Sequence, residues 1–339
     1  MKRCLLISLA FLTAFWGCQK EPSVPAETGS PLLFAPQVSV VGSKAAAADQ
    51  PDDASTLIAP GKVIGVFGTL TPEEEEHVEI FDKQAVQCGE DLGWTYSPLK
   101  YWRIAGVYDF AAVYPYTAEC QAGTSGKRLL VWNNCTSGTD LMIAHAQRDA
   151  ALKDHSPVNL RFRHACSAVR FLFKKGSADY VYHLQSFVLQ NLRIVGILDT
   201  TGEDLTVDSW HTSGMAPASE VFSWSASSAA ERKEIPLEYD DYTGAEWYYM
   251  IPQSMAPAVG YGHPAVAFSV IFNNEPTPVT TTLDLPDSYI DCGDSVEALW
   301  EPGKVYNYFI NLQPSRVAIT VRVTDWDEQS LVVDDITFD

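Results

Sequence analysis

Residues 107 to 116 read VYDFAAVYPY, and this stretch decides the fold class. Its alternation places Tyr108, Phe110 and Tyr114 on one face, as in a β-strand that turns one side to a protein core. Helical periodicity is weak along the rest of the chain, where short strands alternate with Gly, Pro, Asn and Asp. The strands expected there are KVIGVFGTL (62–70), KRLLVWNN (127–134), VNLRFRHACSAVRFLFKK (158–175), VYHLQSFVLQNLRIVGILD (181–199), EWYYMIPQ (246–253), AVAFSVIFNN (265–274), TTTLDL (280–285), VYNYFINLQPSRVAITVRVTDW (305–326) and LVVDDITF (331–338). Regularly spaced strands between turn residues predict an all-β fold of antiparallel β-sandwiches.

The chain is long enough for about two such sandwiches in series. We place the boundary at the polar DHSP of residues 154–157, between an N-terminal β-sandwich domain (45–155) and a C-terminal β-sandwich domain (156–339). Residues 140–153, DLMIAHAQRDAALK, are the best candidate for a short helix, and a strand end followed by a loop fits them equally well.

The first two dozen residues predict secretion. A basic start precedes an apolar run from Leu5 to Trp16, which is too short to stay in a bilayer as a permanent helix. Because Cys18 follows the small residue Gly17, we read residues 1–17 as a lipoprotein signal peptide and Cys18 as the lipidation site. The aromatic end of the apolar run departs from the usual lipobox, which leaves plain signal cleavage as the alternative. Residues 18–30 are polar and proline-bearing, as in a flexible tether.

Acidic residues outnumber basic residues, 43 to 23, and give a net charge of -20. Lys and Arg displace counterions from phosphate backbones, so this balance excludes nucleic-acid binding as a default function. Five cysteines follow Cys18, without CxxC or Cys/His spacing for zinc. We expect them mostly as small buried hydrophobic residues, and a disulfide among Cys88, Cys120 and Cys135 is the alternative in an oxidising compartment.

The chain shows no motif for enzyme chemistry: it has no HExxH, GxSxG, P-loop or EF-hand loop, and no GxGxxG after a strand. His164 lies inside a strong strand pattern, where a lone histidine is more often structural than catalytic. The run Glu73–Glu76 lacks the alternating oxygen ligands of a calcium loop and is better explained as a solvated turn. Carboxylate pairs for glycoside hydrolysis are brought together by folding and stay open. We predict no enzyme activity, no metal and no cofactor.

Aromatic residues suggest a second hypothesis, sugar-stacking platforms, if several of them face solvent. The alternation in residues 107–116 favours the core instead. The residues concerned are Tyr101, Trp102, Tyr108, Phe110, Tyr114, Tyr116, Trp247, Tyr248 and Tyr249.

Several of the same segments carry a family resemblance, in order along nearly the whole mature chain. They are GKVIGVFG (61–68), YWRIAGVYDFAAVYPY (101–116), DLMIA (140–144), VNLRFRHACSAVRF (158–171), EWYYMIPQ (246–253) and WEPGKVYNYFINL (300–312) followed by VTDW (323–326). Together they resemble the Mfa-like fimbrillins of Bacteroidetes. The resemblance implies two transthyretin-like β-sandwich domains, an outer-membrane lipoprotein precursor and a non-enzymatic subunit of a type V pilus on the cell surface. Its implied partners are other pilin subunits, the outer membrane through a lipid anchor, and a host or bacterial surface ligand.

In the resembled family a protease cuts after an arginine and removes the N-terminal strand, which a segment of a neighbouring subunit replaces. Here PLLFAPQVSVV (31–41) has the composition of such a strand, and the loop after it contains Lys44 and Ala45. No arginine lies between Cys18 and Arg103, so the cut is expected after Lys44 by a protease that accepts lysine. Residues 31–44 are then the removable strand and loop.

Three further readings stay open. Without cleavage at Lys44, the subunit keeps its lipid and first strand and serves as an anchor at the fibre base. A surface lipoprotein that binds glycans is the alternative outside pili. The C-terminal segment LVVDDITFD (331–339) is either a closing strand of the second domain, the plainer assumption, or a donor strand.

Overall fold

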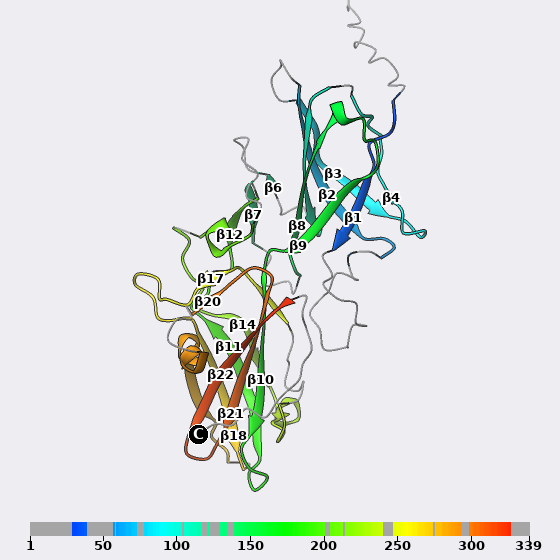
Figure 1. Ribbon diagram of the computed structural model, residues 1–339. Helices are drawn as coiled ribbons and strands as arrows, with labels where there is room; N and C mark the ends of the chain where they lie inside the picture. The colour runs from blue at the N-terminus through cyan, green and yellow to red at the C-terminus, as the bar shows by residue number, and fades with distance from the viewer. Residues whose placement is uncertain are drawn as a thin grey trace, which may run out of the picture.

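The computed structural model describes residues 29–38, 57, 59–72, 78–103, 105–116, 121–122, 129–133, 139–200, 204–212, 214–239, 247–273, 275–292 and 298–326. The regular elements of this part are β-strands and short 3-10 helices (Figure 1). The 3-10 helices are η2 (Ala150–Leu152), η3 (Val207–Ser209), η4 (Ala229–Glu231) and η5 (Leu285–Cys292). The predicted all-β fold class is confirmed. No helix in the described ranges has the length and apolarity to cross a bilayer.

One seven-stranded sheet, called the N-terminal sheet below, fills the upper part of Figure 1. Its strands, in spatial order, are β1 (Phe34–Val38), β9 (Val158–His164), β8 (Met142–Asp149), β5 (Val107–Tyr114), β2 (Val63–Thr71), β3 (Val78–Cys88) and β4 (Trp94–Thr95). All neighbours are antiparallel except β1 and β9, which run parallel. Alternate residues of β9 are buried, as period-2 patterning predicts. The sheet curls around its own core, because the ring of Phe34 on one edge lies 5.6 Å from that of Phe81 on β3.

Two four-stranded paths pack face to face in the lower part of Figure 1 and form the C-terminal sandwich. The first contains β16 (Tyr248–Met250), β10 (Ser167–Lys175), β21 (Lys304–Leu312) and β22 (Val317–Asp325). The second contains β14 (Val221–Ser225), β11 (Tyr182–Gln190), β18 (Ala265–Phe272) and β19 (Val279–Asp284), with β15 (Lys233–Glu234) also on β11. A two-stranded ribbon of β17 (Gln253–Ser254) and β20 (Leu299–Trp300) lies beside them. β10 and β21 are parallel neighbours, and both are buried over most of their length, which explains their nearly continuous apolar sequences.

A small joint sheet connects sequence from both halves of the chain. It contains β13 (Trp210–His211), β12 (Gly196–Asp199), β7 (Leu129–Trp132) and β6 (Gln121–Ala122). Trp132 of this sheet shares one apolar cluster with Ile143 of the N-terminal sheet and Val305 of the C-terminal sandwich. The joint core therefore lies where the three groups of strands meet.

The helix considered for residues 140–153 is wrong, and the alternative of a strand followed by a turn is what forms. Met142–Asp149 is the strand β8, and only Ala150–Leu152 turns, with the Asp149 carboxylate accepting a hydrogen bond from the Ala151 amide at 2.8 Å. The division of the chain after residue 155 stays a prediction. β9, beyond that point, pairs with β8 and β1, and so joins the N-terminal sheet.

Candidate functional site: the seat of the N-terminal strand

The expected removable strand lies in a slot of the N-terminal sheet, with chain on both sides of its first residues. On one side, the amide of Val158 donates to the carbonyl of Leu33 at 2.8 Å. On the other, the amide of Leu32 donates to the carbonyl of Lys100 at 2.8 Å, and the amide of Trp102 donates to the carbonyl of Ser30 at 3.1 Å. We call this slot, formed by β9 and residues 96–102, the strand seat.

The side chains of the strand complete the core beneath it. Leu32 is 0% exposed and Phe34 is 4% exposed, while Leu33 between them is only half-buried. The ring of Phe34 lies 5.5 Å from that of Phe110 and 5.8 Å from that of Tyr96, in edge-on or tilted contacts. Burying two such side chains stabilises the sheet by roughly 3–6 kcal/mol in total. The strand is therefore part of the core, and it is the first described element of the chain.

One buried tyrosine, Tyr96, hydrogen-bonds to the backbone of the strand. The Tyr96 hydroxyl donates to the carbonyl of Leu32 at 2.6 Å and accepts from the amide of Lys100 at 3.2 Å. Burial raises the pKa of Tyr96, so the phenol keeps its proton and remains a donor at physiological pH. This bond contacts only backbone, so it holds any strand seated here without regard to that strand's side chains.

Polar side chains add contacts at both ends of the seat. Near the entry, Nδ1 of His155 lies 3.1 Å from Oγ of Ser30, and the His155 ring stacks on Trp102 at 6.0 Å. Near the exit, Nε2 of Gln37 donates to Oδ1 of Asn159 at 3.3 Å. These contacts are exposed to water, so each contributes little stability compared with the two buried side chains.

The residues predicted for maturation are not among the described residues. Cys18, Lys44 and Ala45 are outside the residues that the structure describes, as is the run Glu73–Glu76. The strand described here ends at Val38, so the predicted cut lies a few residues beyond it in the sequence.

His164 is a buried structural residue, as expected. Its Nδ1 lies 2.6 Å from Oδ2 of Asp140, and its ring stacks on Trp326 with centroids 3.9 Å apart. Trp326 in turn stacks on Tyr249 at 5.7 Å. The stack of His164 on Trp326 therefore joins the end of β9 to the last described residue of the chain, within the joint core.

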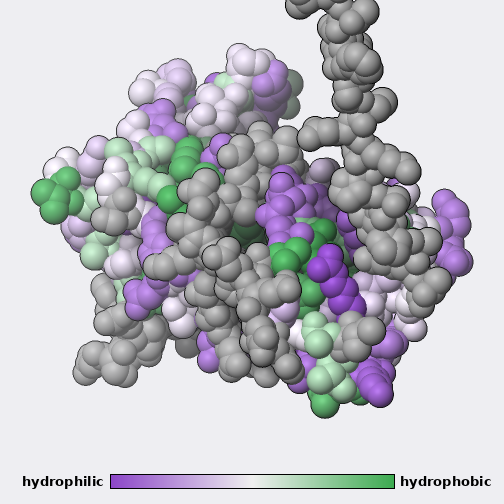
Figure 2. Space-filling view, turned by 90° about the horizontal axis from the view of Figure 1, so that it is seen from above, coloured by the Kyte–Doolittle hydropathy of each residue, from purple (hydrophilic) through white to green (hydrophobic). Residues whose placement is uncertain are grey.

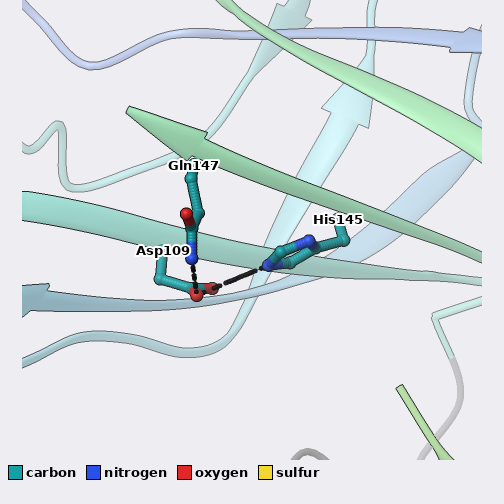
Figure 3. A network of polar contacts seen from close by, with 3 residues as sticks. All are labelled: Asp109, His145 and Gln147. Carbon is teal, nitrogen blue, oxygen red and sulfur yellow. Dashed lines mark hydrogen bonds and ion pairs between the residues drawn. The ribbon is translucent and has the colours of Figure 1, made fainter. Parts of the chain in front are cut away.

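Sequence reasoning missed a polar network on the outer face of the N-terminal sheet (Figure 3). Nε2 of His145 lies 3.2 Å from Oδ1 of Asp109, and Nε2 of Gln147 donates to Oδ2 of Asp109 at 3.0 Å. Asp109 and Gln147 lie directly opposite each other on β5 and β8, so the network is a cross-strand contact. Within the described ranges, no group of three His, Cys, Asp or Glu side chains is placed to hold a metal ion. The strand alternation could have located this face but not the pairing across it.

Most aromatic residues of the proposed sugar platform are in the core. Trp102 is 7% exposed, Tyr108 and Phe110 are 0% exposed, and Tyr249 is 4% exposed. Tyr116 is exposed and lies under the ammonium group of Lys83. The view from above shows hydrophilic and hydrophobic side chains mixed over the coloured part of that face, without a broad apolar platform (Figure 2). The core interpretation of these aromatic residues is the better one.

Two of the cysteines are free and buried, as expected of small hydrophobic residues. Cys88 and Cys166 carry no disulfide, so the alternative of a bridge that includes Cys88 is wrong. Burial, with a smaller effect of the nearby Asp91 carboxylate, raises the pKa of the Cys88 thiol and disfavours the reactive thiolate. Cys120 and Cys135 lie outside the described residues.

Comparison with known proteins identifies the family. The sequence matches the fimbrillin-like family over residues 48–326, most of its length. The chain belongs to that family. No curated protein sequence matches it at a significant level.

Solved structures share the fold at low sequence identity. A fimbrial protein from Bacteroides vulgatus superposes with a TM-score of 0.56 at 14% identity, covering 86% of this chain and 99% of that one. A putative cell adhesion protein from Bacteroides ovatus gives a TM-score of 0.51 at 18% identity, covering 90% of this chain and 99% of that one. The predicted fimbrillin resemblance is confirmed. As a member of the fimbrillin-like family, the chain is a fimbrial structural protein and not an enzyme.

Proposed function

We propose that this fimbrillin is a stalk or tip subunit of a type V pilus, which polymerises by strand exchange in the strand seat. The observation that supports the proposal is that the segment around β1 is buried in the core and yet is joined to the rest of the sheet by the chain beyond Val38 alone. Leu32 and Phe34 are fully part of the core, yet a single cut beyond Val38 separates the strand from the rest of the sheet. Loss of the strand would leave an apolar groove and unpaired backbone groups, which a strand from the next subunit can fill by β-augmentation.

The geometry of the seat favours such an exchange. β1 pairs with β9 in parallel, and parallel pairing is slightly less stable per residue than antiparallel pairing. A donor strand entering in the opposite direction would pair antiparallel with β9, while its other side would meet residues 100–102 in parallel. Tyr96 would hold the backbone of that strand as it holds Leu32, just before β1, because its hydroxyl contacts a backbone carbonyl.

The proposed route starts at the outer membrane. Residues 1–17 direct export, Cys18 carries the lipid, and residues 18–30 tether the two β-sandwich domains, which we propose to be transthyretin-like, to the cell surface. A protease that accepts lysine cuts between Lys44 and Ala45 and releases the lipid and the first strand together. The partners are other pilin subunits, with a host or bacterial surface ligand at the tip. The last residues, 331–339, either close the second domain or act as the donor strand.

Two alternatives predict different products. An uncleaved chain is a pilus anchor that keeps its lipid and β1. A glycan-binding lipoprotein needs exposed aromatic residues, and the burial of Trp102 and Tyr249 gives it little support.

The proposal is tested on the protein recovered from native cells, by intact mass in membrane and sheared-fibre fractions. The expected result is a start at Ala45 in the sheared fraction and a lipidated Cys18 start in the membrane. Lys44→Gln should abolish the Ala45 product and the high-mass assemblies, whereas Lys20→Gln, a lysine in the tether, should leave both unchanged. A lipidated chain found only in membranes, without higher-mass assemblies, would overturn polymerisation and favour the anchor.

A further inference from the structure

A second edge of the molecule is open to pairing, far in sequence from the strand seat. β19 ends the order β14-β11-β18-β19, and within the described ranges no strand pairs with its other side. It leads into η5, the orange helical turns at the left of Figure 1. Five of its six residues, Val279–Leu283, carry no charge, and Val279 is 59% exposed. Natural proteins usually protect such edges with charges, bulges or short length.

The other edge strands in the described part of the chain carry such protection, and β1 contains Pro36. β22 contains Arg322 and Asp325. β14 is bulged, with Phe222 at φ +50° and a register shift on β11 between Phe187 and Leu189. The edge strands β4, β6 and β13 have two residues each, and β16 has three. β19, in contrast, pairs with β18 without a register shift over its whole length.

The pairing with β18 shows which backbone groups of β19 point outward. The amide of Leu285 donates to the carbonyl of Pro264, one step beyond the ladder, so this position is a hydrogen-bonded pair. Hydrogen-bonded pairs alternate along an antiparallel ladder. The amides and carbonyls of Thr280, Thr282 and Asp284 therefore point away from β18, and their side chains lie on the outer face of the sheet.

We infer that β19 pairs antiparallel with β19 of a second copy of this chain, around a two-fold axis at Thr281. In this register Thr280 and Thr282 exchange backbone hydrogen bonds with Thr282 and Thr280 of the second copy. The amide of Asp284 meets the carbonyl of Pro278, and exposed Val279 lies opposite Leu283.

The sequence of the edge is self-complementary, which is why a second copy is the occupant. Threonine pairs face each other across the axis, and cross-strand Thr–Thr pairs are favourable. No like charges lie directly opposite between Pro278 and Asp284, although the chain as a whole carries a charge of -20 that makes two copies repel. Pairing should therefore strengthen as added salt screens that repulsion. The resulting contact is lateral and independent of the strand seat and of Lys44.

The test is sedimentation equilibrium of the full-length chain carrying Cys18→Ser, so that no acyl chain contributes to association and Lys44 stays uncut. The expected result is a monomer–dimer equilibrium. Thr280→Lys combined with Thr282→Lys places two lysines opposite each other and should weaken dimerisation by about tenfold or more. Thr280→Lys combined with Thr282→Glu places opposite charges together and should retain the dimer. All three substitutions lie on the exposed outer face, so folding is preserved.

A control at the other edge of the same sheet tests position. Ser223→Lys on the bulged strand β14 should leave the equilibrium unchanged. A monomer at every concentration and salt level, or equal dimerisation of the Lys/Lys and Lys/Glu variants, would overturn the proposed pairing. Neither result would bear on strand exchange, because the chain in this experiment is uncleaved.

Discussion

The N-terminal sheet and the C-terminal sandwich complete their cores in different ways. In the N-terminal sheet, Phe34 fills the aromatic cluster from a strand that is the first described element of the chain. In the C-terminal sandwich, the central strands β10 and β21 are continuous with folded chain at both ends, and their rings pack together, as in the 4.9 Å stack of Phe171 on Tyr308. One backbone cut beyond Val38 can therefore separate Phe34 from the first region, whereas β10 and β21 each lie between two other strands of the chain.

This difference concerns connectivity more than contact quality. Phe34 is as well packed as Phe268 in the C-terminal sandwich, at 4% and 1% exposure. A core residue stabilises a fold only as long as its strand stays attached. Phe34 in the N-terminal sheet can therefore be lost from its core by one cut, although it is buried as deeply as Phe268 in the C-terminal sandwich. The following predictions test that contrast.

The largest effect is expected from Phe34→Ala. Removing the ring should cost about 3–5 kcal/mol of unfolding free energy and loosen β1, because the cavity lies where β1, β3 and β5 meet. Hydrogen exchange of the Val158 amide, which donates to Leu33, reports on the seat directly. The matched change Phe268→Ala should cost a similar amount while leaving that amide protected. A loss below about 1 kcal/mol with Phe34→Ala would contradict a core role for the strand.

Alkaline pH should destabilise the C-terminal sandwich more than the N-terminal sheet. Burial raises the pKa of Tyr182, Tyr239 and Tyr306 in the C-terminal sandwich, and of Tyr96 in the strand seat. Below pH about 10 these phenols are protonated in both the folded and the unfolded chain, so their contribution is fully present. As pH rises further, only the unfolded chain ionises, and stability falls. Unfolding followed from pH 8 to 12 should therefore show the greater loss in the C-terminal sandwich; equal losses would argue against this burial difference.

The sequence predicted the strands better than their partners. Alternation identified β5 and the long apolar runs identified β10 and β21, since one-sided and two-sided burial leave different patterns. The parallel pairings of β1 with β9 and of β10 with β21 join segments far apart in sequence, and no local pattern encodes them. The same reason applies to the strand seat: composition pointed to residues 31–41 as a strand, but not to Tyr96 as the residue that holds its backbone.

The joint between the regions should respond to His164→Phe. A phenyl ring preserves the stack on Trp326 but removes the hydrogen bond to the buried carboxylate of Asp140, at an expected cost of about 1–3 kcal/mol. Differential scanning calorimetry should show a lower transition temperature. His145→Gln, a change in the half-exposed network of Figure 3, is the control and should cost about 0.5 kcal/mol or less. Equal effects of the two variants would show that the buried pair adds nothing specific to the joint.

The smallest effect, and the most specific to the seat, is expected from Tyr96→Phe. The variant keeps the ring that packs on Phe34 and removes only the hydroxyl that donates to the carbonyl of Leu32. A neutral buried hydrogen bond contributes about 0.5–1.5 kcal/mol, so exchange of the Leu32 and Val158 amides should accelerate by roughly twofold to tenfold while the C-terminal sandwich is unaffected. Tyr101→Phe, in the neighbouring half-buried position, should change neither rate. Because the lost bond is to backbone, a foreign strand seated in place of β1 should be weakened by Tyr96→Phe to the same extent; a loss confined to β1 would mean that the seat recognises side chains instead.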